Sequence, residues 1–270
     1  MNIIIHRGTH QIGGSAIEIS TASTRIILDF GNELSLDEKY TPINLDIDGV
    51  TKGILDCDGI VISHYHMDHL GQLTSALPEI PLYMGELSKE VAMIATEHQD
   101  KDLYLRLLDA NTFRGGEAFT IGNIHIRPLV IDHSAVDSYM FVIESEGKRV
   151  LYTGDFRMHG VRGHVLEKLI RTYIGDVDVL ITEGTSLSRN AHDGISEREV
   201  LDDISSYIQD GKYVFVMCSS TNIDRIMEIW HNMPTDKVLI CDAYQKRILD
   251  TVIDNVYYDS TLYRRPDSPL

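Results

Sequence analysis

Hydrophobic residues in the first part of the chain occur in short runs that are typical of β-strands. Three Ile-rich segments, Asn2–His6, Ser15–Ser20 and Arg25–Leu28, are separated by Gly or Ser/Thr turn residues. A further apolar strand is predicted at Gly59–Ser63, where it leads directly into a polar loop rich in histidine. Apolar residues then recur at helical spacing over residues 87–95. This pattern predicts a meander of strands that changes into a mixed α/β arrangement.

The middle of the chain is again rich in strands. A Glu-Gly-Lys turn at residues 146–148 joins two of them and indicates a β-hairpin. A helix is predicted over residues 165–173, because its apolar residues lie on one face. The predicted strands of this part are Ala118–Ile121, Ile124–Ile131, Tyr139–Glu144, Val150–Thr153 and Val177–Thr182.

The pattern changes again from about residue 187. Ser196 and Glu199 have the spacing of a capping box and predict the start of a helix. Strands predicted at Tyr213–Met217 and Val238–Cys241 alternate with two further helices. Strict alternation of helices and strands predicts a parallel sheet for this part of the chain.

The composition is that of a globular protein with a strongly acidic balance. Among 270 residues, 43% are hydrophobic, and 24 Lys and Arg residues stand against 41 Asp and Glu, which gives a formal net charge of −17. This balance argues against a broad electropositive surface. No apolar run approaches the length of about 18 residues that a membrane span needs. A cytoplasmic protein without a membrane segment is therefore predicted.

Candidate chemistry is concentrated in the segment Ser63-His64-Tyr65-His66-Met67-Asp68-His69, at the end of a predicted strand. Three imidazoles and a carboxylate on one loop suit a divalent metal of borderline softness. The alternative is a polar turn that happens to hold three histidines, and the small number of histidines in the chain, 12, disfavours it. The three cysteines lie far apart and form no C-x-x-C pair, so a metal here must use imidazole and carboxylate.

The H-x-H-x-D-H motif after a strand resembles the metallo-β-lactamase superfamily, and other motifs follow in the order of that superfamily. Asp29, in Leu-Asp-Phe-Gly, matches the early aspartate that supports the metal loop. His133 matches the histidine of the third motif, and Asp155, in Thr-Gly-Asp-Phe, matches the bridging carboxylate. Each residue taken alone is more often an ordinary loop residue, but all three end predicted strands. The resemblance implies a four-layer αββα sandwich with a metal site on its edge, here over residues 1–186.

Finer motifs resemble one branch of the superfamily, ribonuclease J and its β-CASP relatives, which process RNA or DNA. These motifs are the glycine-rich segment Gly13–Glu18, the segment Asp132–Tyr139, and Glu183-Gly184-Thr185, which is similar to the first acidic motif of the β-CASP domain. The resemblance implies that residues 187–270 form part of a parallel α/β β-CASP-like domain. The expected class of the whole chain is accordingly α/β (α+β).

The resemblance also implies a site for two divalent cations. Zinc is expected, with manganese as the alternative, because all the candidate donors are nitrogen or oxygen. Two cations about 3.5–4 Å apart activate water for attack on a phosphodiester. The implied ligands are His64, His66 and His133 for one cation, Asp68 and His69 for the other, and Asp155 as the bridge. Asp68 and Asp155 are the implied catalytic residues, and Asp29, Ser134 and Glu183 the supporting ones.

The implied substrate is RNA or another single-stranded nucleic acid. Arg157 is the candidate for a local basic edge, with a solvated Arg at a strand end as the alternative. His159 and His164 are expected to be exposed loop histidines, with a position near the metals or a role as proton donors as the alternative. Apolar strand residues after Tyr213 would leave an unpaired edge, which favours homo-oligomers.

Two rival interpretations stay open at the level of sequence. The same motif suits a hydrolase of small esters, thioesters or lactones. In addition, no histidine follows His231, which lies in a helical pattern beside Trp230, so the histidine that closes the second metal site in this branch has no counterpart. The chain is therefore expected to be an N-terminal portion of a longer protein, or a short form with an incomplete, non-catalytic metal site.

Overall fold

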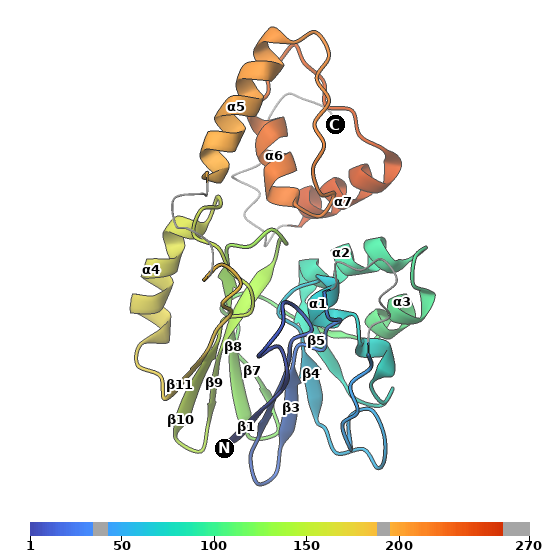
Figure 1. Cartoon of the computed structure of the whole chain (residues 1–270), viewed down its shortest axis with the longest axis vertical. Coiled ribbons are helices and arrows are strands. Elements are labelled where there is room, and N and C mark those ends of the chain that lie inside the picture. Colours follow the sequence, from blue (N-terminus) through green and yellow to red (C-terminus); the bar gives the residue numbers. More distant parts are fainter. Residues whose placement is uncertain (35–42, 188–194, 256–270) are drawn as a thin grey trace.

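Two β-sheets face each other in the computed structural model, which describes residues 1–34, 43–187 and 195–255 (Figure 1). The first sheet has six strands in sequence order, with its first three antiparallel and the remainder parallel. Its strands are β1 (Asn2–Arg7), β2 (Ala16–Ser20), β3 (Arg25–Leu28), β4 (Gly59–Val61), β5 (Leu82–Gly85) and β6 (Asn111–Phe113).

The second sheet has five strands in the order β11-β10-β9-β8-β7. All neighbours are antiparallel except β10 and β11, which run parallel. The predicted hairpin at residues 146–148 is confirmed, because Glu146 and Gly147 both have positive φ, as a tight two-residue turn requires. The strands are β7 (Phe119–Ile121), β8 (Ile124–Ile131), β9 (Ser138–Ser145), β10 (Lys148–Tyr152) and β11 (Val179–Ile181).

Helices cover the outer face of each sheet (Figure 1). The helices are α1 (Met67–Leu70), α2 (Glu86–Thr96), α3 (Lys101–Leu108), α4 (Leu166–Leu169), α5 (Glu197–Asp210), α6 (Ile223–Asn232) and α7 (Ala243–Asp254). The helix predicted over residues 165–173 is formed by α4 together with a preceding 3-10 turn, Gly163–Val165, and a following π-helical turn, Ile170–Ile174. Among residues 1–34, 43–187 and 195–255, no helix is both long and apolar enough to cross a bilayer.

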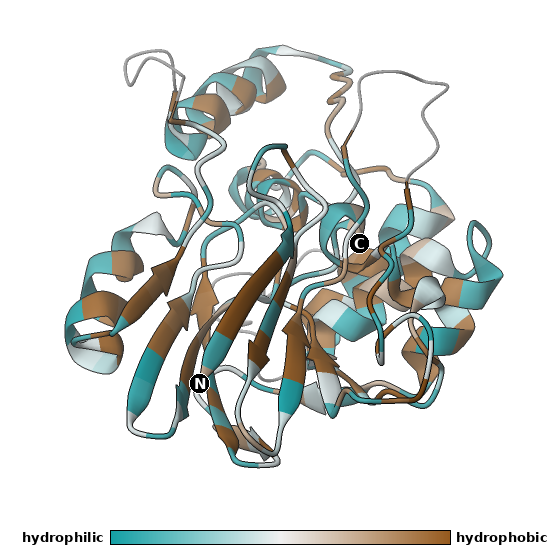
Figure 2. Ribbon diagram, turned by 60° about the horizontal axis from the view of Figure 1, so that its bottom comes forward, coloured by the Kyte–Doolittle hydropathy of each residue, from teal (hydrophilic) through white to brown (hydrophobic). Residues whose placement is uncertain are grey.

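Alternation along the strands produces the layers. In β9, Phe141 and Ile143 point into the core between the two sheets, whereas Met140 and Val142 pack on the other side with Leu166 of α4. The first sheet also directs one set of side chains into the core between the sheets, and its outer face packs against α2 and α3. The strands are accordingly mostly hydrophobic in Figure 2. The predicted αββα sandwich is confirmed.

The C-terminal part contains α5, α6 and α7, which lie above the sandwich in Figure 1. The predicted capping box of α5 is formed by Ser196 and Glu199. The strands predicted at Tyr213–Met217 and Val238–Cys241 are wrong, because neither segment pairs in a ladder within the described residues. An extended segment becomes a strand only beside a partner, and here the side chain of Phe215 is 97% exposed. The predicted domain boundary at residues 186 and 187 stays a prediction.

Candidate metal centre

The histidine-rich loop begins where β4 ends and closes on the short helix α1. His64 is fully buried, and its Nε2 lies 3.1 Å from Nδ1 of His66. The other ring nitrogen of His64, Nδ1, lies 3.0 Å from the hydroxyl of Ser63, which fixes the orientation of the ring. The loop therefore presents two imidazole nitrogens to one point at the edge of the sandwich.

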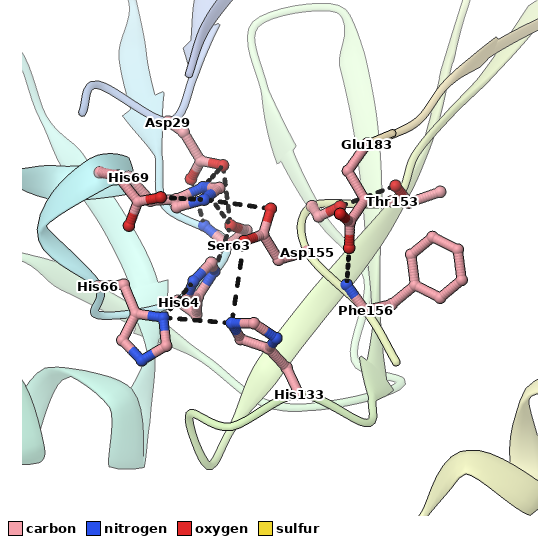
Figure 3. Close-up of polar contacts among 12 residues, drawn as sticks. Asp29, Ser63, His64, His66, His69, His133, Thr153, Asp155, Phe156 and Glu183 are labelled. Carbon is pink, nitrogen blue, oxygen red and sulfur yellow. Dashed lines mark hydrogen bonds and ion pairs between the residues drawn. The ribbon is translucent and has the colours of Figure 1, made fainter. Parts of the chain in front are cut away.

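Two residues from the second sheet complete the cluster (Figure 3). His133, which follows β8, places Nε2 3.2 Å from Nδ1 of His66. Asp155, which follows β10, places Oδ1 3.3 Å from Nε2 of His69 and Oδ2 3.9 Å from Nε2 of His133. These residues form two overlapping triads whose donor atoms lie within 4.8 Å of one another: His64, His66 and His133, and His64, His69 and Asp155.

The donor set fits a divalent cation such as zinc. Imidazole nitrogens with no hydrogen-bond donor between them repel one another through their lone pairs, unless a cation or a proton lies between them. Nitrogen and carboxylate oxygen are also the donors that zinc and manganese accept. Asp68 is close to the second triad, with Oδ2 3.7 Å from Nε2 of His69. All six predicted ligands thus lie in one cluster, while their metal-binding roles stay a proposal.

Asp29 holds the loop from beneath. It follows β3 in the left-handed region, with φ of 56°, and its carboxylate is fully buried. Oδ1 accepts a hydrogen bond from the backbone N–H of Ser63 at 2.7 Å, and Oδ2 lies 2.8 Å from Nδ1 of His69. The hydroxyls of Ser63 and Tyr152 also donate to Oδ2, at 2.8 and 2.5 Å. Asp29 therefore lies where a residue that supports the metal loop is expected.

Backbone contacts from two glycine-containing loops fix the position of Asp68. The N–H groups of Gly14 and Ser15 donate to the carbonyl of Asp68 at 3.1 and 3.2 Å. Gly31 passes so close that a Cβ there would lie 1.6 Å from the same carbonyl oxygen. Buried Arg7 joins the two loops, because its Nη2 donates to the carbonyl of Gly31 at 2.7 Å and its Nε to that of Gly14 at 3.2 Å.

The remaining predicted residues differ in their environments. The carboxylate of Glu183 accepts the N–H of Phe156 at 2.9 Å and so anchors the loop of Asp155 (Figure 3). Ser134 is half-buried beside His133, and its supporting role stays a prediction. Arg157 was expected to provide a local basic edge, but its guanidinium is paired with carboxylates. Nε donates to Asp132 at 2.8 Å and Nη1 to Glu197 at 3.3 Å. His159 and His164 are exposed, as predicted.

The sequence assigned no role to three side chains around the cluster: Ser63, which contacts His64 and Asp29, Tyr152, which donates to Asp29, and Asp132, which pairs with Arg157. Each is the immediate neighbour of a motif, since Ser63 precedes His64 and Asp132 precedes His133, while Tyr152 is the last residue of β10. Their position beside the motifs was the only available signal, because their contacts depend on how the two sheets face each other.

Burial and mutual repulsion keep three imidazoles of the cluster neutral. Desolvation lowers the pKa of His66 to about 4 and that of His133 to about 3, and it lowers the pKa of His64 well below its usual range. Burial alone would also lower the pKa of His69, but the carboxylates of Asp29 and Asp155 outweigh it and raise that pKa. The first triad is therefore ready for a cation at neutral pH, whereas a cation beside His69 must displace a proton.

Stability of the metal-free protein should fall as the pH decreases from 6.5 toward 4. In that window His64, His66 and His133 take up protons in the unfolded chain but not in the folded one, so each contributes a slope of roughly 1.4 kcal/mol per pH unit. His69 adds no slope there, because it is protonated in both states. Denaturant unfolding in the presence of a chelator at pH 6, 5.5 and 5 measures this slope. The variant His66→Gln should have a shallower slope, and an equal slope would contradict the assignment.

One known protein family matches most of this chain. The beta-lactamase superfamily domain matches residues 25–241, a range that contains every candidate ligand. The chain belongs to the beta-lactamase superfamily. The resemblance drawn from the H-x-H-x-D-H motif is thereby confirmed, and the cluster lies at the edge of the sandwich where this superfamily is expected to hold its metals.

Similar curated proteins carry ribonuclease names. The chain is 27% identical to the RNase J-like protein of Methanocaldococcus jannaschii, over 78% of this chain and 49% of that protein. It is 26% identical to Ribonuclease J 2 of Streptococcus pyogenes, over 83% of this chain and 41% of that protein. These matches confirm the resemblance to ribonuclease J-like proteins. The chain spans about half the length of the curated relatives it matches.

Solved structures support the fold. A protein of unknown function from Enterococcus faecalis V583 superposes with a TM-score of 0.78, at 19% sequence identity, over 92% of this chain and 66% of that one. The superposition extends over more of the chain than the sandwich alone, so the placement of the C-terminal helices has a counterpart in that protein.

Proposed function

We propose that the chain is a metal-dependent hydrolase that cleaves phosphodiester bonds of RNA. The observation that carries this proposal is the position of Asp155, a member of the second triad, whose two carboxylate oxygens face His69 and also His133 of the first triad. A carboxylate shared by two sets of imidazoles suits a pair of cations better than a single one. The competing picture of a polar turn with three histidines gives no reason for a carboxylate in that place.

Zinc is the proposed cation, with manganese as the alternative. When bound, it would supply Lewis-acid chemistry that stabilises charge on the phosphodiester and makes water a stronger nucleophile. His64, His66 and His133 would hold one cation, Asp68 and His69 the other, and Asp155 would contact both. Asp29 keeps His69 in one orientation, so that Nε2 faces the site.

Asp68 is the proposed proton acceptor. Its side chain is 14% exposed, so water reaches it, and burial raises its pKa. A raised pKa makes a carboxylate a better base, provided that it stays ionised at the working pH. Its backbone carbonyl accepts hydrogen bonds from the N–H groups of Gly14 and Ser15, and these bonds hold Asp68 at the edge of the cluster.

RNA is the proposed substrate because the similar proteins are named RNase J-like protein and Ribonuclease J 2. A partial β-CASP-like domain at residues 187–270 and a cytoplasmic location belong to the same proposal. Arg157 is paired with Asp132 and Glu197, so we assign it the task of holding the His133 and Asp155 loops together. Contact with phosphate therefore falls to other groups.

Cleavage assays with three substrates test the proposal. The purified chain, loaded with Zn²⁺ or Mn²⁺, should cleave a labelled single-stranded RNA and a simple phosphodiester, and chelation should abolish both activities. A thioester tests the rival hydrolase of small esters. Exposed His159 provides a control, because His159→Ala should leave RNA cleavage unchanged. Thioester cleavage without RNA cleavage would favour the rival, and metal binding without any turnover would favour a non-catalytic form.

A further inference from the structure

Tyr65 lies between the two candidate ligands His64 and His66 in the sequence, but its side chain points away from the cluster into the core. It is 6% exposed and packs in the same hydrophobic cluster as Val136 and Ile223. Its ring meets the imidazole of His66 edge-on, with 5.6 Å between the ring centroids. The residue therefore touches a candidate ligand without being a ligand.

The hydroxyl of Tyr65 connects three segments that are distant in the sequence. It accepts a hydrogen bond from the backbone N–H of Val136 at 3.1 Å, on the loop that carries His133. It donates to the backbone carbonyl of Thr221 at 2.9 Å, just before α6 begins. Both partners are main-chain groups. The hydroxyl of Tyr65 therefore contacts the backbone of the two loops and not their side chains.

We propose that Tyr65 is a positioning residue that makes cation affinity at the first triad depend on where the C-terminal helices lie. Its hydroxyl fixes the distance between the loop of His64 and His66 and the loop of His133, while the carbonyl of Thr221 keeps the hydroxyl in place. This inference rests on the proposed metal centre and adds a structural link between that centre and the segment before α6.

The hydroxyl is the part of Tyr65 that does this, because a phenylalanine ring would fill the same core space. In Tyr65→Phe the N–H of Val136, a fully buried residue, would lose its hydrogen-bond acceptor. The loop of His133 would then be free to move away from His66. Nε2 of His133 and Nδ1 of His66 are 3.2 Å apart, so a small movement changes the geometry offered to a cation.

Other contacts hold the C-terminal helices on the sandwich, so loss of the hydroxyl would not detach them. Arg162 donates to Asp224 of α6 at 2.6 Å. Glu197 of α5 forms an ion pair with Arg157 of the sandwich and also with Arg225 of α6. The effect of Tyr65→Phe should therefore be confined to the contact between the loops.

A comparison of two Tyr→Phe variants tests the inference. Tyr139 is as buried as Tyr65 and donates its hydroxyl to Asp137, whose carboxylate accepts the N–H of Ser88 in α2. Tyr139→Phe thus removes a buried hydroxyl with no contact to a candidate ligand. Titration with Zn²⁺ against a chromophoric chelator should show affinity about 10–100-fold weaker in Tyr65→Phe, the range for loss of a group that orients ligands, and unchanged in Tyr139→Phe.

Absorption of the Co²⁺-loaded proteins gives a second readout, since its visible bands follow coordination geometry. The bands should change in Tyr65→Phe and stay as in the parent in Tyr139→Phe. Parent-like affinity and spectrum in Tyr65→Phe would overturn the inference and leave the proposed function standing. An equal loss in both variants would also overturn it, as a general packing effect. A parent chain that binds neither metal would overturn the inference and the metal centre together.

Discussion

Asp155→Asn is expected to weaken cation binding at both positions of the cluster by more than about 100-fold. The substitution keeps the size of the side chain but removes a unit of negative charge from between His69 and His133. Loss of a group that only orients ligands costs about 10–100-fold in affinity, and loss of a shared ligand should cost more. Zinc titration of the variant and the parent measures the effect, and RNA cleavage should disappear with it.

Two comparison variants separate this role from a general charge effect. Asp29→Asn should weaken binding less, because Asp29 orients His69 and Ser63 but does not face the cluster. Asp178→Asn removes an equal charge from a surface ion pair with Lys148 and should change nothing at the site. If Asp155→Asn keeps the zinc affinity of the parent, Asp155 does not bridge two cations.

Gly31→Ala is expected to destabilise the fold by about 3 kcal/mol and to displace the loop of Asp68. The new Cβ would meet backbone atoms, which cannot rotate away as a side chain can: the carbonyl oxygen of Asp68 at 1.6 Å and its carbonyl carbon at 2.0 Å. The hydrogen bond from Phe30 N–H to the carbonyl of His69 lies next to this clash. Denaturant unfolding and zinc titration of the variant measure both consequences.

Gly184→Ala is the matched control for this substitution. Its Cβ would meet only the end of the Leu187 side chain, which is 88% exposed and free to turn away. Gly184 also has no positive φ, so alanine introduces no backbone strain there. A free energy of unfolding that changes equally in Gly31→Ala and Gly184→Ala would show that the contact at Asp68 carries no special constraint.

Much of the site could be predicted because its residues lie in short motifs at strand ends. His64, His66, Asp68 and His69 are carried by one loop after a short apolar strand, and that local pattern specifies both the loop and its donors. His133 and Asp155 also come after apolar strands, and their place in the same site was predicted from the resemblance to the superfamily. The strand predicted at Tyr139–Glu144 is likewise confirmed as β9, because its apolar residues form one continuous run.

Partners across the fold could not be predicted in the same way. The pairing of Arg157 with Asp132 and Glu197 joins segments separated by up to 40 residues, and no local pattern shows that the guanidinium is occupied. The hydrogen bond from Tyr65 to Thr221 joins residues 156 positions apart. The contacts with Glu197 and Thr221 follow from the packing of the C-terminal part on the sandwich, and the contact with Asp132 follows from the meeting of two loops of the second sheet.

In the segments after α5, the sequence predicted strands that the structure does not form. Residues 213–217 have the apolar and β-branched composition of a strand, but a ladder needs a neighbour and the described residues provide none. The strands β5 and β6 were missed because they have only four and three residues, too few for a clear pattern. Local propensity thus predicted the sandwich better than the C-terminal part.

Metal content of the reconstituted chain tests the central claim most directly. After loading with Zn²⁺ and dialysis, elemental analysis should find between about one and two equivalents per chain, with the first triad the fuller position because its imidazoles are already neutral. His133→Ala should remove most of the tightly held zinc. Less than about a tenth of an equivalent in the parent, or an unchanged content in His133→Ala, would contradict a metal centre at this cluster.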